Sequence, residues 1–409
     1  MGGGVFSVLR GGVLVLSFVL IAVGRVPWLR MNRTGFAFVG ATLVVVTGLL
    51  PLEEALSAID MRTIVLLLSM MIVSSNLTYA GFFDLVADWV ILRGKSPLRL
   101  LALLMMCTAI LSAFFVNDTV CVVITPFVLL LTERYGLPAV PYLIGLAVSA
   151  NIGSAMTLVG NPQNMYIGAV SGIPFGRFFL RMVGPSLLSL AFAYGVVVLV
   201  YRKEFREVRW ESPQGHVKRL RIYRPLLYKC YASMALLVIL LMVGTSIVYA
   251  AMVAASVLLI TRRIHPEKIF TQVDFSILTF FGGLFVLTKG VEATGILAAL
   301  RGVETLLSLK GWVLAPLAAV LSNLVSNVPA VMLLSPMVER MSSETGWLVL
   351  SLASTYAGNL TLLGSVANLI VAERARSAGV LLTFMEYLKV GIPVTVVSLS
   401  VGTAWLFIR

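Results

Sequence analysis

The sequence has little charge, few cysteines and almost no histidine. Asp, Glu, Lys and Arg make up 12% of its 409 residues, against about 25% in a soluble globular protein. So few charges cannot cover the water-facing surface of a chain this long, which excludes a soluble domain. The three cysteines and two histidines have neither disulfide-framework nor metal-site spacing. We therefore expect no metal and no other cofactor.

Catalytic motifs are lacking as well. The chain has no HExxH and no Gly-x-Ser-x-Gly sequence. Gly94-Lys95-Ser96 resembles only the end of a phosphate-binding loop, because Trp89 stands where such a loop begins with glycine. We expect that the protein is not an enzyme.

The sequence is rich in long apolar stretches. Hydrophobic residues make up 59% of the chain, and stretches that could cross a bilayer, which takes about 20 residues each, recur throughout. These features predict an all-α membrane protein with about ten transmembrane helices. The predicted crossings cover 12–28, 34–50, 62–80, 138–170, 176–200, 228–243, 246–261, 273–290, 346–372 and 380–407.

Two further apolar segments carry a polar tip at their centre. Segments 97–132 and 311–340 are each long enough for two helices. We interpret them as re-entrant hairpins that enter and leave the membrane on one side. Full crossings at both places would give twelve spans instead, and this alternative stays open.

The net charge of +13 does not indicate nucleic-acid binding, because Lys and Arg lie in short loops between apolar runs. Cationic loops usually stay in the cytoplasm. Placing the basic loop 202–229 inside puts most of the 31 Lys and Arg residues on the same side, with both termini outside. We expect a multi-pass protein of the cell inner (plasma) membrane. Anionic lipid headgroups or a separate ATPase subunit would suit this loop.

The two halves of the chain resemble each other. Asn117 and Asn327 each stand nine residues before a proline, and the sequence Thr-Leu-x-Gly occurs at Thr157 and Thr361, each followed by an asparagine seven residues after the threonine. Five crossings per half would insert the second half with the opposite orientation, as in the inverted repeats of secondary transporters. The expected organisation is a first repeat at 1–201 with a broken helix at 138–170, the loop 202–229, and a second repeat at 230–409 with a broken helix at 346–372.

Four polar clusters interrupt the apolar segments, two in each half. Gly and Pro break helices, and Asn and Ser supply hydrogen bonds to backbone groups that lose their partners. Broken backbone at membrane depth is tolerated only inside protein or along a wet cavity, where half-helix ends can bind a small ion or solute. Helix packing alone is the alternative reading. The predicted substrate-binding residues are Asn117, Asp118, Thr119, Asn151, Thr157, Gly160, Asn161, Asn164, Ser326, Asn327, Asn359, Thr361, Gly364, Ser365 and Asn368.

Asp118 stands apart from the other polar residues. It is the only charged residue between Arg99 and Glu133. An ionisable group within an apolar segment is costly and usually functional, so we expect Asp118 to couple transport to a proton or another ion. Its counterpart in the second half is Val328. A structural acid, hydrogen-bonded at the hairpin tips, is the alternative.

At these clusters the chain resembles the ion transporter superfamily and, within it, the arsenite permease and sodium/proton antiporter branch. The resemblance covers most of the chain. It implies two hairpins and two broken helices around one substrate site, an elevator-type movement, and often a homodimer. The matching residues are Phe115-Val116-Asn117-Asp118 leading to Pro126, Gly160-Asn161-Pro162-Gln163-Asn164, Ser326-Asn327-Val328-Pro329, and Gly358-Asn359 leading to Asn368.

The residues at the two hairpin tips indicate which substrates are favoured. Dicarboxylate relatives carry Ser-Asn-Thr at both tips, whereas this chain has Asp118 in the first tip and Val328 in the second. A carboxylate repels a di-anion unless it is protonated. Proton-coupled efflux of arsenite or antimonite is therefore the leading hypothesis. A sodium/proton antiporter is the alternative, and a dicarboxylate or oxyanion symporter is less favoured.

Overall fold

The computed structural model describes residues 2–24, 26, 29–207, 222–260, 265–294 and 311–408. Helices make up 81% of the described residues, and no β-strand occurs among them. Half of the predicted basic loop, residues 208–221, lies outside the described residues, Arg209 and Lys218 included. Arg25 and the last residue of the predicted span 246–261 lie outside them too.

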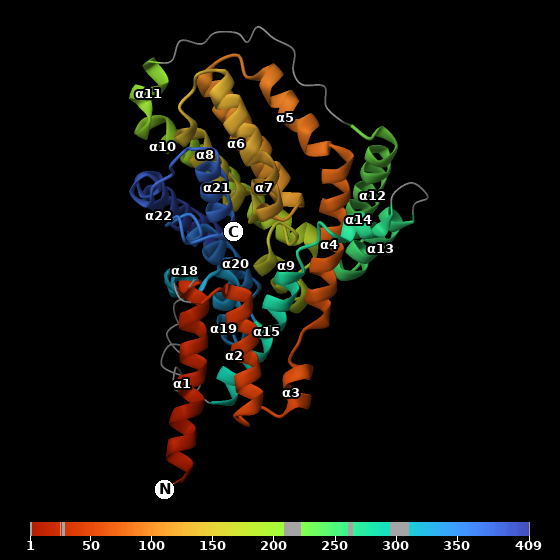
Figure 1. Cartoon of the computed structure of the whole chain (residues 1–409), viewed down its shortest axis with the longest axis vertical. Coiled ribbons are helices and arrows are strands. Elements are labelled where there is room, and N and C mark those ends of the chain that lie inside the picture. The colour runs from red at the N-terminus through yellow and green to blue at the C-terminus, as the bar shows by residue number, and fades with distance from the viewer. Residues whose placement is uncertain are drawn as a thin grey trace.

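The first half begins with two neighbouring helices, α1 and α2, and ends with the long helix α10 followed by the short helix α11 (Figure 1). Its helices are α1 (Gly2–Val23), α2 (Arg33–Val46), α3 (Leu52–Ser57), α4 (Met61–Ala80), α5 (Phe82–Arg93), α6 (Pro97–Phe114), α7 (Asn117–Arg134), α8 (Ala139–Ser154), α9 (Pro162–Val170), α10 (Phe175–Val200) and α11 (Arg202–Glu207).

Within the described residues, the second half repeats much of this order of long and short helices. Its elements are α12 (Arg224–Met242), α13 (Ile247–Leu259), α14 (Pro266–Phe270), α15 (Phe275–Ala293), the 3-10 turn η1 (Gly311–Val313), α18 (Leu314–Val325), α19 (Asn327–Arg340), α20 (Glu344–Ala357), α21 (Val366–Ser377) and α22 (Phe384–Ile408).

Six described helices are long and apolar enough to cross a membrane: α4, α6, α10, α12, α15 and α22. Five shorter apolar segments lie in α1, α2, α8, α13 and α18. Every predicted crossing coincides with a helix or a broken pair of helices. The number of full crossings stays a prediction.

Two pairs of helices turn back at polar tips. α6 and α7 lie side by side and are joined only by Phe115 and Val116, whose extended backbone interrupts the helix (Figure 1). α18 and α19 also pack together and are joined by Ser326 alone. The predicted tips therefore lie at the two turns. Likewise, the predicted broken helices consist of α8 with α9 and of α20 with α21.

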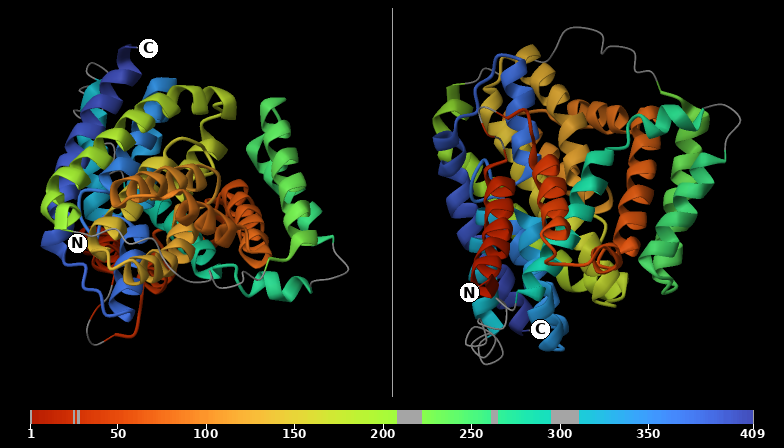
Figure 2. Two further views of the ribbon diagram at one scale, coloured as in Figure 1. Left: turned by 90° about the horizontal axis from the view of Figure 1, so that it is seen from above. Right: turned by 60° about the horizontal axis from the view of Figure 1, so that its bottom comes forward.

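The halves interlock through exchanged helix pairs. α2 of the first half packs along α15, α13 of the second half packs along α4, and α10 packs against α22. Figure 2 shows the green pair α12–α13 at one edge of the molecule, beside α4. α2 and α15 approach so closely that a Cβ on Gly283 would lie 2.8 Å from the backbone of Ala37. These contacts frame the hairpins and broken helices.

Candidate functional site

The first hairpin tip docks on the break between α8 and α9. Asn161 caps α9: its Oδ1 accepts from the Asn164 amide at 2.8 Å, and its Nδ2 donates to Ser154 Oγ at 2.9 Å. The backbone N–H of Asn117, at the tip, donates to the Gly160 carbonyl at 3.0 Å. A Cβ on Gly160 would lie 2.3 Å from the Ser154 carbonyl oxygen, so glycine is required for this close approach.

Each broken helix uses one asparagine to satisfy the carbonyls that the break releases. Asn164 Nδ2 donates to the carbonyls ten and seven residues before it, at 3.2 and 2.9 Å. Asn368 Nδ2 donates at the same two spacings, at 2.7 and 3.1 Å. Buried carbonyls need such partners, so these asparagines hold the two breaks in shape.

Asn151 joins the two halves. Its Oδ1 accepts from Asn117 Nδ2 at 3.2 Å and from Ser365 Oγ at 3.0 Å. Its Nδ2 donates to Asn359 Oδ1 at 2.9 Å and to Asn368 Oδ1 at 3.0 Å. The side chain is 1% exposed. One amide therefore connects the first hairpin tip, α8 and the second broken helix.

α20 supplies two partners that the sequence analysis missed. Ser351 Oγ donates to Asn164 Oδ1 at 2.7 Å. Thr355 Oγ1 accepts from Asn161 Nδ2 at 3.3 Å and from Gln163 Nε2 at 3.2 Å. The two hydroxyl residues stand one turn apart on α20. Because residues four apart lie on one face of a helix, this spacing could have predicted the polar face that α20 turns toward α9.

A cavity of about 1490 Å³ lies beside this network, between the hairpin tips and the helices α4, α15 and α21. The other predicted residues lie behind its wall, where they hold the breaks; Thr157, for example, donates its hydroxyl to the Ala113 carbonyl. The predicted residues that line the cavity are Asn117, Asp118, Thr119, Ser326, Asn327 and Ser365.

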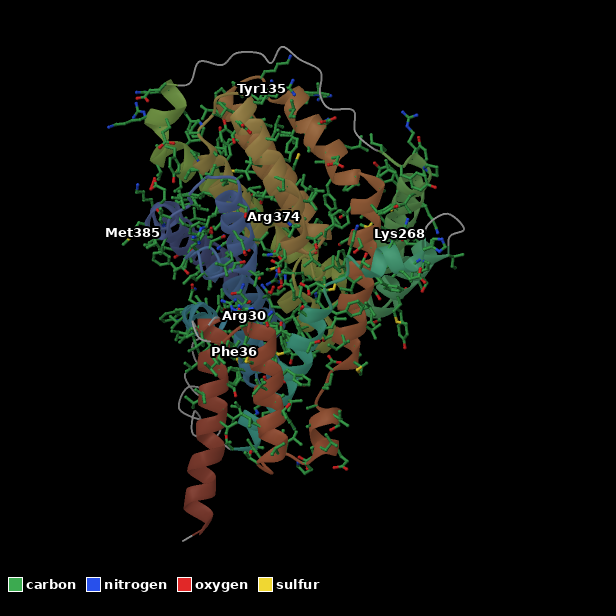
Figure 3. The ribbon with its side chains drawn as sticks, in the orientation of Figure 1. Arg30, Phe36, Tyr135, Lys268, Arg374 and Met385 are labelled. Carbon is green, nitrogen blue, oxygen red and sulfur yellow. The ribbon has the colours of Figure 1, made fainter. Side chains whose placement is uncertain are left out.

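Five charged residues line the cavity, of which sequence analysis singled out one. Asp118 stands at the first tip, Arg33 at the start of α2, Asp274 at the start of α15, and Glu373 and Arg376 on α21. In Figure 3, Arg30 marks the connection before α2 and Arg374 marks α21. Arg33 was missed because a cation in a short loop is typical of topology rather than of a site. Asp118 makes no ion pair or hydrogen bond with another residue of the described ranges.

The second tip differs from the first in its backbone. Ser326 has φ 79° and ψ 158°, a region that only glycine adopts without strain, which costs about 1–3 kcal/mol for another residue. We expect Ser326→Gly to raise the free energy of unfolding by about 1 kcal/mol. Thermal unfolding of the purified protein measures this. Ser326→Ala is the control, since it removes the hydroxyl and keeps the strain; a Gly variant no more stable than the Ala variant would contradict strain at this tip.

Comparisons with known proteins agree with this architecture. The chain is 31% identical to the silicon efflux transporter LSI3 of Oryza sativa subsp. japonica, over 97% of each chain. It is 27% identical to a transporter of Dictyostelium discoideum that carries the name arsB, over 95% of this chain and 90% of that one. The crystal structure of the Alcanivorax borkumensis YdaH transporter covers 98% of each chain with a TM-score of 0.54 at 16% identity, which is a likeness of fold.

The family match covers residues 18–357, and the family is described as CitMHS, citrate transporter. The resemblance to the ion transporter superfamily is thereby confirmed. The fold and the relatives identify a multi-pass membrane transporter. The chain belongs to the CitMHS citrate transporter family.

Proposed function

We propose that this chain is a secondary active transporter that exports arsenous or antimonous acid in exchange for protons, with Asp118 carrying the proton. The position of Asp118 carries the proposal. Its carboxylate stands at a hairpin tip, lines the cavity, and forms no hydrogen bond or close ion pair with another side chain of the described ranges. An ionisable group so placed in a membrane protein marks an ion or proton pathway.

An uncharged hydroxide suits the cavity better than a polyanion. Among the described residues, three carboxylates and two guanidinium groups line it. Excess negative charge repels an anion such as citrate. A neutral hydroxide avoids this repulsion and offers O–H donors to carboxylate and amide oxygens. The rice relative is a silicon efflux transporter, and silicic acid, like arsenous acid, is a small hydroxide that is uncharged at neutral pH.

We also propose that the two halves form an inverted repeat that works as an elevator. The equal spacings of the bonds made by Asn164 and Asn368 support the repeat. So does the exchange of contacts across the halves, from Asn161 to Thr355 and from Ser365 to Asn151. The cavity lies between the hairpin tips and helices α4 and α15, where sliding of the hairpins would move the site. A homodimer remains part of this proposal.

A sodium/proton antiporter is the second candidate. The amide oxygens of Asn117 and Asn327 are enclosed and have no hydrogen-bond partner in the described ranges. Carbonyl and carboxylate oxygens are the ligands that hard cations prefer. Two such oxygens near Asp118 favour a cation as an alternative cargo.

Solute uptake into proteoliposomes tests the proposal. Arsenous acid, silicic acid, sodium and citrate are offered separately, with protein-free liposomes as the control. We expect protein-dependent movement of the two neutral hydroxides. Movement of sodium alone would replace the proposal by the antiporter. Movement of citrate alone would contradict the argument from the cavity charges.

A further inference from the structure

Most amide oxygens of the predicted site already accept a hydrogen bond from within the protein. Those of Asn151, Asn161 and Asn164 each accept a hydrogen bond from within the network. Those of Asn359 and Asn368 both accept from Asn151. The remaining two, on Asn117 and Asn327, are enclosed without a partner. Five of the seven predicted asparagines are therefore committed to the hydrogen-bond network rather than to a solute.

Gln163 differs from all of them. It follows Pro162 at the start of α9, is 4% exposed, and lines the cavity that Asp118 also lines. Its Oε1 accepts no hydrogen bond from another described residue. Unlike the amide oxygens of Asn117 and Asn327, it keeps some accessible surface. The oxygen is therefore reached from the cavity.

The other half of the molecule fixes the orientation of this amide. Gln163 Nε2 donates to Thr355 Oγ1 at 3.2 Å, and Thr355 belongs to α20. The same hydroxyl accepts from Asn161 Nδ2 at 3.3 Å, whose own Oδ1 is committed to the Asn164 backbone amide. Since the nitrogen of Gln163 is held by Thr355, its oxygen is the atom left for the solute.

We propose that Gln163 is a specificity-determining residue whose amide oxygen accepts a hydrogen bond from a hydroxyl of the transported solute, and that Thr355 is its positioning residue. This inference rests on the proposed function. Gln163 Oε1 and the Asp118 carboxylate face one cavity, and both can accept hydrogen bonds. A solute rich in O–H groups satisfies both acceptors, whereas an ionised carboxylate group has no donor to offer either.

Uptake kinetics with arsenous acid as the probe test the inference. Gln163→Met keeps the length of the side chain and removes the acceptor, so we expect KM to rise by about three- to tenfold, the value of one lost hydrogen bond, with the maximal rate little changed. Gln272→Met is the matched control, because Gln272 lines the same cavity as an exposed residue and has no such anchor. Its KM should rise less than that of Gln163→Met.

Thr355 provides the test of positioning. Thr355→Val keeps the shape and removes the hydroxyl, and we expect a smaller rise in KM. Thr355→Ser, which keeps the hydroxyl, should restore the native value. The double variant Gln163→Met with Thr355→Val should be no worse than Gln163→Met alone, because the two act on one contact.

Three outcomes are decisive. If the native protein moves arsenous acid and Gln163→Met leaves KM unchanged, the inference is wrong and the proposed function stands. If the effects of Gln163→Met and Thr355→Val add, Thr355 does not act through Gln163. If the native protein moves no neutral hydroxide, the proposed function fails, and the inference falls with it.

Discussion

Asp118→Asn is expected to abolish uphill transport while downhill movement of the solute continues. An amide cannot take up or release a proton near neutral pH, so a pH gradient can no longer drive accumulation. An uncharged solute needs no charge at the tip to pass. The measurement is accumulation of arsenous acid in proteoliposomes under an imposed pH gradient, compared with exchange of the solute without a gradient.

Asp274→Asn is the matched control for this experiment. Asp274 lines the same cavity, and its Oδ1 accepts from the Ser276 amide at 2.9 Å as the cap of α15. Asparagine also caps helices well, so the variant should fold and still accumulate the solute. Accumulation by Asp118→Asn at the native level would show that the proton is carried elsewhere.

Asn151→Ala is expected to destabilise the protein more than any surface change. It removes one amide that makes four hydrogen bonds, to Asn117, Ser365, Asn359 and Asn368. Each buried polar group left without a partner costs about 1–3 kcal/mol, so we expect a loss of roughly 3 kcal/mol or more. Thermal unfolding in detergent and the yield of folded protein measure it.

Ser398→Ala is the control for buried polar deletion. Ser398 is fully buried, and its hydroxyl has no partner in the described ranges. Its removal should leave stability unchanged or slightly raised, because no hydrogen bond is lost. Equal unfolding temperatures for Asn151→Ala and the native protein would mean that Asn151 does not hold the halves together.

Much of the fold could be predicted from the sequence, because helix-breaking clusters in apolar runs mark the turns directly. The tip at Asn117 and the break before Pro162 lie where the polar residues placed them. Helix α5 (Phe82–Arg93) was not predicted, because it is apolar but too short to read as a crossing. Its place depends on packing against α4, α6 and α7, which no local pattern encodes.

The sequence predicted which asparagines belong to the candidate site, but not which residues they contact. The asparagines were identified, since amides at membrane depth need partners. Which of them bond to each other depends on how the halves interlock, and Thr355 becomes a partner only because α20 packs against α9. In the sequence, Arg33 and Asp274 only mark the starts of helices α2 and α15. In the structure they line the cavity. The substrate-binding role of all these residues stays a prediction.

In the proposed function, transport of a neutral hydroxide is coupled to transport of protons. The most direct test loads native proteoliposomes with a pH-sensitive dye and imposes a gradient of arsenous acid with no initial pH difference. We expect a change in internal pH that requires both the protein and arsenous acid and is absent in Asp118→Asn. A change in internal pH driven by sodium or by citrate, with none for arsenous acid, would contradict it.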